Sequence, residues 1–408
     1  GPRTPPMARA PYVPEAETAP PEPDRVEGAP HPRATLRLFG QEAAESAFLD
    51  AWAAGRMHHA WLLTGPRGVG KATLAWRMAR AMLAAPAPGQ GGGLFGEAPS
   101  EPGPPESLDM DPQDPVFRRV QALSEGRVRL LRRPWDDKTK RLKTQIAAED
   151  ARALRELFAN TAADGGWRIA VVDCVDEMNA QSANALLKLV EEPPARSMFL
   201  LVCHQPSRIL PTIRSRCRTL VLRPLSPPDL AAAVTQAKEA EGEEAPELGA
   251  SAEALHALSG GSAGEALRLA AEGGPKLYAR LVRMASGAPG MNRADFHDWA
   301  ATVTGRDNAP RLDASLRLVE LLLARLARAG AGKAMTPEAA PGEAELAARL
   351  SAHAGQARVW AEAAQEIPAR AARARAVNLD PDRIILDTFS ALDACARRAA
   401  ALQGPPPA

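Results

Sequence analysis

The chain has 408 residues, of which 45% are hydrophobic, so it can bury more than one core and we expect two or three domains. Its 50 lysines and arginines nearly balance its 49 aspartates and glutamates, which excludes nucleic-acid binding by overall positive charge. The cysteines lack C-x-x-C spacing and no apolar run approaches the roughly 20 residues of a membrane span, which predicts a cytoplasmic protein without zinc, disulfides or a membrane segment.

The first half of the chain alternates β-type and helical segments, which predicts a parallel α/β sheet covered on both faces. Residues 1–35 are proline-rich and lack periodic apolar positions, so we expect a disordered tail. Residues 85–145 are predicted to be an insert or long loop. The expected helices cover 43–53 and 73–84, and the expected strands cover 60–64, 127–132, 169–173, 199–203 and 219–222.

From about Pro224 onward the β-type pattern stops and the apolar residues follow helical spacing. Ser226 precedes two prolines and an aspartate, the pattern of a capped helix start. We expect a small helical domain over 225–275, a second helical domain over 276–402 and a frayed end over 403–408.

A glycine-rich loop between the first predicted strand and its helix matches G-x-x-x-x-G-K, a pattern whose backbone N–H groups cradle phosphate. The position after Lys71, where the pattern has Ser or Thr to bind magnesium, is Ala72, so metal binding should be weakened. The alternative is a glycine turn that binds no nucleotide. The candidate nucleotide-binding residues are Gly65, Pro66, Arg67, Gly68, Val69, Gly70, Lys71, Ala72, Thr73 and, at the end of a later strand, Asp173.

Asp173 ends the apolar strand that should carry the acidic residues of a nucleotide hydrolase, and the next residue is Cys174. A cysteine cannot replace the glutamate that orients or deprotonates the attacking water. Asp176 and Glu177 come after the strand, where we expect only a solvated turn.

These features, together with Phe39–Glu42, Gly55–Ala60, Asn184–Pro194 and Ser215–Cys217 in matching order, resemble the bacterial DNA polymerase III clamp-loader family. The resemblance implies an AAA+ nucleotide-binding-like domain over 36–224, a helical lid over 225–275 and an all-helical collar for oligomerisation over 276–402. It also implies that Gly264 replaces the lid arginine of the ATPase subunits.

The same resemblance implies that Arg216 is an arginine finger, which reaches the nucleotide of an adjacent subunit. Without the resemblance, Arg216 would be interpreted as part of a surface ion pair. A retained finger beside a defective site is typical of the delta-prime type. The alternative within the family is a catalytically active ATPase motor subunit.

The implied cofactor is ATP or ADP with magnesium, bound without hydrolysis. The implied partners are gamma/tau-type ATPase subunits, the delta subunit, the sliding clamp and primed DNA. The chain would belong to the DNA polymerase III holoenzyme, a DNA-directed DNA polymerase and thus a nucleotidyltransferase, without polymerase activity of its own.

Ten lysines and arginines lie between Arg118 and Lys143, with Phe117 and Trp135 nearby. This pattern favours a solvated basic hairpin, with a contact to DNA backbone or to an acidic partner as the alternative.

Overall fold

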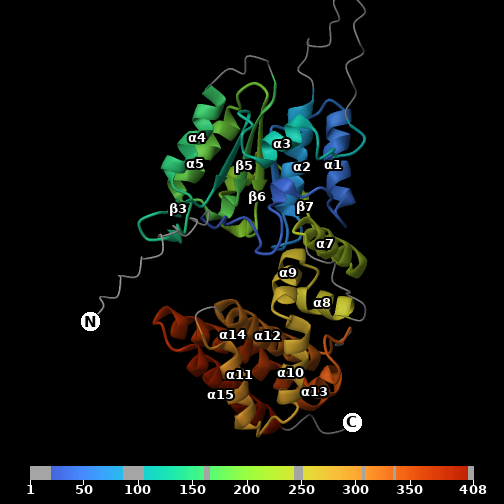
Figure 1. Ribbon diagram of the computed structural model, residues 1–408, viewed down its shortest axis with the longest axis vertical. Helices are drawn as coiled ribbons and strands as arrows, with labels where there is room; N and C mark the ends of the chain where they lie inside the picture. Colours follow the sequence, from blue (N-terminus) through green and yellow to red (C-terminus); the bar gives the residue numbers. More distant parts are fainter. Residues whose placement is uncertain are drawn as a thin grey trace, which may run out of the picture.

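The computed structural model describes residues 20–85, 105–159, 166–242, 251–305, 308–333 and 337–402. An α/β half stands above a helical half, with a small group of helices between them (Figure 1). The predicted tail over 1–19, the frayed end over 403–408 and the part of the insert over 86–104 lie outside the described residues.

The α/β half is built on a five-stranded parallel sheet with the order β2-β5-β6-β1-β7. The strands are nearly continuous apolar runs because helices cover both faces. Each predicted strand is present within two residues of its expected ends, which confirms the predicted α/β fold. The strands are β1 (Ala60–Thr64), β2 (Val128–Arg132), β5 (Arg168–Asp173), β6 (Ser197–Val202) and β7 (Arg218–Val221).

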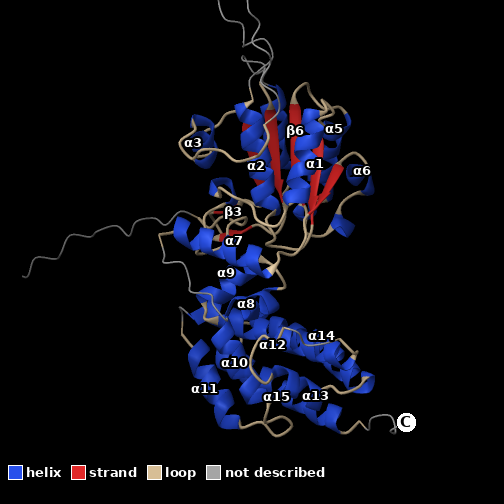
Figure 2. Ribbon diagram, turned by 90° about the vertical axis from the view of Figure 1, so that its right-hand side faces the viewer, coloured by secondary structure: helices blue, strands red, loops and turns tan. Residues whose placement is uncertain are grey.

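Two sets of helices bury the two faces of the sheet (Figure 2). One set packs Phe48 and Trp76 against Trp61 of β1, and the other packs Leu154 and Leu186 against the opposite face. The first set is α1 (Glu42–Ala53), α2 (Lys71–Ala84) and α3 (Pro115–Gln121), and the second is α4 (Ala148–Ala159), α5 (Ala180–Glu191) and α6 (Pro211–Arg214), with short turns η2 (Val175–Glu177) and η3 (Pro206–Arg208).

The segment predicted as an insert is largely part of the fold. Among its described residues, α3 packs on α2, and β2 is an edge strand of the main sheet, paired with β5. A small antiparallel hairpin follows, β3 (Trp135–Asp136) and β4 (Arg141–Leu142). The proline and glycine content of 85–115 hid these elements, because turn residues dominate the local pattern.

Residues 20–35, expected to be disordered, follow a defined path that includes η1 (Pro32–Ala34). His31 Nε2 lies 2.9 Å from Asp24 Oδ2, and both side chains are almost fully buried. Arg132 Nη1 of β2 contacts the same aspartate at 2.5 Å, whereas Ala29 packs into the core of the helical half. Polar contacts to the buried Asp24, including its ion pair with Arg132, therefore hold a segment that has too few apolar residues to show helical or strand periodicity.

The remaining elements are helices, as the sequence predicts. A single hydrophobic cluster extends from Leu225 to Ala399 and joins α7–α9 to the helices that follow. Among the described residues no helix is long and apolar enough to cross a membrane. The helices are α7 (Pro227–Ala240), α8 (Ser251–Ser259), α9 (Ala263–Ala271), α10 (Gly274–Ala285), α11 (Arg293–Val303), α12 (Ala309–Gly330), α13 (Glu343–Leu350), α14 (Ala354–Ala376) and α15 (Pro381–Ala400).

Candidate functional site

The predicted phosphate loop connects β1 to α2 at the carboxyl edge of the sheet. Gly65, Gly68 and Gly70 have φ values of +136°, +79° and +103°, which L side chains rarely adopt. At Gly65 a Cβ would also lie 2.3 Å from the backbone oxygen of Leu222. Conformation and close packing together require glycine here.

Lys71 is the first residue of α2 and is buried. Its ammonium group donates a hydrogen bond to the Gly65 carbonyl at 2.7 Å and a second one to the Pro66 carbonyl. Burial lowers the pKa of Lys71 to about 8, although the neighbouring Asp173 carboxylate opposes this. The cation that would contact phosphate is therefore bonded to its own loop.

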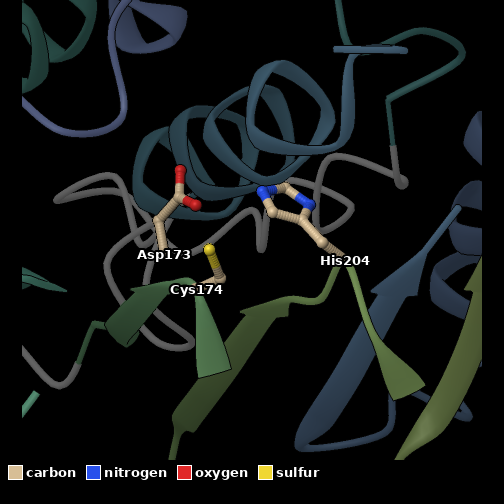
Figure 3. Close-up of side chains that lie close together, drawn as sticks. All are labelled: Asp173, Cys174 and His204. Atoms are coloured by element: carbon tan, nitrogen blue, oxygen red, sulfur yellow. The ribbon is translucent and has the colours of Figure 1, made fainter. Parts of the chain in front are cut away.

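Asp173, Cys174 and His204 meet beside this loop, where β5 and β6 end (Figure 3). Burial raises the pKa of Asp173 to about 7, and the charge of Asp24 adds to the rise. Burial also raises the pKa of the Cys174 thiol, so this side chain is a neutral thiol at pH 7. For His204, burial and the nearby Lys71 lower the pKa to about 4, which leaves the imidazole neutral.

Asp176 and Glu177 are not the solvated turn that the sequence suggests. Asp176 Oδ1 accepts a hydrogen bond from the backbone N–H of His204 at 2.9 Å. Glu177 Oε2 lies 2.8 Å from Arg133 Nε. The two carboxylates therefore hold the end of β6 and the segment after β2 in place, a tertiary role that local sequence does not reveal.

The start of α9, in the helical segment that was predicted to be a lid, contacts the phosphate loop directly. The backbone N–H of Gly264, in the first turn of α9, donates to the Gly68 carbonyl at 3.1 Å. A Cβ on Gly68 would lie 2.3 Å from Ser262 Oγ, and a Cβ on Gly264 would lie 3.2 Å from the Gly68 Cα atom. Gly264 stands where the resemblance places an arginine in the ATPase subunits. Because it has no side chain, α9 can approach Gly68 to van der Waals distance.

A cavity of about 190 Å³ lies between the phosphate loop, the lid and the N-terminal segment, and Asp24, Lys71, Asp173 and His204 are among its lining residues. Typical ligand sites measure roughly 300–1,000 Å³. The lid occupies the approach to Gly68, and Ala72 offers magnesium no oxygen. In this arrangement the loop keeps its phosphate-binding backbone, but a magnesium ion there would lack the hydroxyl ligand that Ser or Thr supplies at position 72.

The structure brings residues 65–73 together with Asp173, as predicted from the sequence, whereas Arg216 lies elsewhere. Neither His204 nor Asp24 was given a role from the sequence. The only sequence signal for His204 was its position directly after an apolar strand, parallel to the strand that ends in Asp173.

Residues 116–226 match the family described as DNA polymerase III, delta subunit. A DNA polymerase III subunit gamma/tau of Mycobacterium bovis is 30% identical over 216 residues, which cover 52% of this chain and 32% of that protein. A DNA polymerase III subunit delta' of Pseudomonas aeruginosa is 33% identical over 229 residues, which cover 55% of this chain and 59% of that protein.

A gamma subunit-related protein of Thermotoga maritima aligns in structure over 88% of this chain and all of that one, at 14% identity and a TM-score of 0.38. The chain spans between a third and three fifths of the length of the two curated relatives described above. The family match covers β2, β5, β6 and β7 of the sheet, together with Asn184–Pro194 and Ser215–Cys217. These matches support a relationship between this chain and the clamp-loader subunits of bacterial DNA polymerase III.

Proposed function

We propose that the chain is a delta-prime type subunit that supplies Arg216 to the nucleotide site of a neighbouring ATPase subunit. The observation that carries this proposal is a contrast between two regions. In the phosphate loop, Lys71 is hydrogen-bonded to loop carbonyls and α9 contacts Gly68. Arg216, in contrast, is exposed at the opposite edge of the sheet. The chain would complete a loader that contains gamma/tau-type and delta subunits and places the sliding clamp on primed DNA.

Arg216 follows α6, which packs beside α5 (Figure 2), and precedes β7. Because β7 runs parallel to β1, its first residue lies at the amino edge of the sheet, whereas the phosphate loop lies at the carboxyl edge. Four strand residues separate these edges, a distance of roughly 13 Å. Arg216 is therefore poorly placed for its own loop and well placed for another chain.

The Arg216 side chain is 41% exposed, and its Nη2 atom lies 3.0 Å from Oε1 of Glu191, which is 39% exposed. Its Nη1 atom donates a hydrogen bond to the Thr212 carbonyl at 3.1 Å. An exposed ion pair of this kind contributes roughly 0–1 kcal/mol. Glu191 can therefore hold the guanidinium in position and still release it to a more strongly charged phosphate.

The second candidate is the ATPase motor subunit, which the similarity to gamma/tau and the complete Gly65–Lys71 pattern favour. A motor role would require hydrolysis despite three separate changes in the nucleotide site. Ala72 cannot bind magnesium, Cys174 cannot act as the catalytic carboxylate, and Gly264 has no side chain to contact a γ-phosphate. Binding of ATP or ADP without hydrolysis would require the Gly264–Gly68 contact to open.

The test is ATP hydrolysis by the loader reconstituted from its subunits, stimulated by clamp and primed DNA, with Arg216→Ala in this chain only. We expect hydrolysis to fall roughly tenfold or more while assembly, followed by size-exclusion chromatography, is unchanged. Arg214→Ala is the matched control, since Arg214 is also exposed and lies two residues away.

Lys71→Ala in this chain separates the two candidates. If the chain has a delta-prime role, the loader with this variant should hydrolyse ATP at the unchanged rate. If the chain is a motor subunit, the rate should fall as far as it does when a catalytic lysine is removed. If Arg216→Ala retains full hydrolysis in an intact loader, the arginine-finger proposal is wrong.

A further inference from the structure

Three side chains of different chemistry converge beside the phosphate loop: the Asp173 carboxylate, the Cys174 thiol and the His204 imidazole. Their ligand atoms all lie within 4.8 Å of one another. Figure 3 shows one ring nitrogen of His204 directed toward the other two side chains. Each group is an established ligand of a divalent transition metal.

The surroundings favour a fixed site over an accidental approach. Asp173 and Cys174 are 7% and 3% exposed at the end of a central strand. His204 is anchored through its backbone N–H, which donates to Asp176. The ring nitrogen that faces the cluster is Nε2, whereas the buried Nδ1 atom, on the other side of the ring, has no hydrogen-bond partner and is a place for an ordered water.

We propose that Asp173, Cys174 and His204 bind one divalent ion of the zinc class, in place of the magnesium that the nucleotide site of a hydrolase would hold. Sulfur and nitrogen ligands select zinc or cobalt, whereas magnesium requires oxygen ligands in octahedral geometry. The sequence alone predicted no zinc site, because the cysteines show no C-x-x-C spacing.

Metal–ligand bonds of about 2.0–2.3 Å place neighbouring ligand atoms of a tetrahedral site roughly 3.2–3.7 Å apart. Side-chain rotations that move the atoms by about an ångström would close the set. Three protein ligands leave a fourth position for water, which the adjoining cavity can supply.

Binding releases two protons to solvent when both groups start protonated, one from the Cys174 thiol and one from the Asp173 carboxyl group. The two negative ligands then neutralise the ion. Lys71 does not compete for the carboxylate within ion-pair distance, since its ammonium group is bonded to the loop carbonyls of Gly65 and Pro66.

The experiment uses the full chain after chelator treatment. Zn²⁺ is titrated in competition with a chromogenic chelator, and Co²⁺ is added separately to record its thiolate-to-metal charge-transfer absorption. We expect one Zn²⁺ per chain, a charge-transfer band with Co²⁺, and a higher thermal unfolding midpoint with Zn²⁺ but not with the same concentration of Mg²⁺.

Cys174→Ala should abolish the cobalt band, and His204→Ala should weaken Zn²⁺ binding at least tenfold. The matched controls are Cys217→Ala, which removes a cysteine outside the cluster, and His297→Ala, which removes an exposed histidine of α11. Both should bind as the unmodified chain does.

The proposal is overturned if the unmodified chain binds no stoichiometric Zn²⁺, or if its Co²⁺ complex lacks the thiolate band. It is also overturned if Cys174→Ala keeps the band and Cys217→Ala loses it. The Zn²⁺ titration and the Co²⁺ spectrum use the unmodified chain. The proposal can therefore be refuted even if the substituted chains misfold.

Discussion

Replacing Asp173 by asparagine should stabilise the protein, and the gain should depend on pH. Burial, with the charge of Asp24, raises the pKa of Asp173 from its ordinary value of 3.8 to about 7. Below about pH 4 both the folded and the unfolded chain hold this proton, so the carboxyl group imposes no penalty. Between pH 4 and 7 the unfolded chain releases the proton while the folded chain retains it, so the free energy of unfolding falls as the pH rises.

One pKa unit corresponds to about 1.4 kcal/mol, so the full rise corresponds to about 4 kcal/mol above pH 7. An asparagine side chain at this position keeps the shape of the aspartate without its charge. The advantage of Asp173→Asn over the unmodified chain should therefore grow by about 2–3 kcal/mol between pH 5 and pH 8. This is an upper value, because any water that enters the site would reduce the cost of the charge.

The assay is urea unfolding at pH 5, 6 and 8 with a chelator present, so that no divalent ion occupies the site. Asp137→Asn is the control, since the Asp137 side chain is 87% exposed and should show no pH-dependent gain. A gain that is equal at every pH, or a loss of stability at pH 8, would refute the electrostatic reasoning.

Two further substitutions test packing. Gly68→Ala should lower the free energy of unfolding by about 2–3 kcal/mol, since it combines a positive φ with a Cβ 2.3 Å from Ser262 Oγ. Gly55→Ala, at φ +62° with open space around it, should lower it by about 1 kcal/mol. Equal losses in urea unfolding would argue against close contact between α9 and the phosphate loop. Arg325→Met should cost about 3–5 kcal/mol because it leaves Glu343, 2.5 Å from Arg325 Nε and fully buried, without its cation. The double variant with Glu343→Gln removes the buried charge and keeps an acceptor for the Tyr278 hydroxyl and the Ala339 N–H, so it should recover most of that loss in thermal unfolding, and failure to recover it would show that lost packing is responsible.

The sheet and the phosphate loop could be predicted from the sequence because their signals are local. Apolar runs indicate each strand within two residues, and the glycines before Lys71 indicate the loop directly. Cys174 was identified as a replacement for a catalytic carboxylate from its place after one strand. All of these features depend on neighbours along the chain.

The features that were missed depend on contacts between distant segments. His204 joins Asp173 and Cys174 only because β5 and β6 are parallel neighbours that end at the same edge. The ordered path of residues 20–35 depends on Arg132, more than a hundred residues later. Likewise, the Gly264–Gly68 hydrogen bond joins segments almost two hundred residues apart, so no local pattern could indicate it.

The single hydrophobic cluster from Leu225 to Ala399 has a mechanical consequence. The lid helices and the C-terminal helices share one core, so they should turn together as a rigid arm, while the sheet has its own cores. The chain crosses between these bodies near residues 222–225 and again through the N-terminal segment that contains Ala29. Any force that lifts α9 from the phosphate loop would therefore be transmitted to the far end of the arm, where α11 and α15 lie (Figure 1).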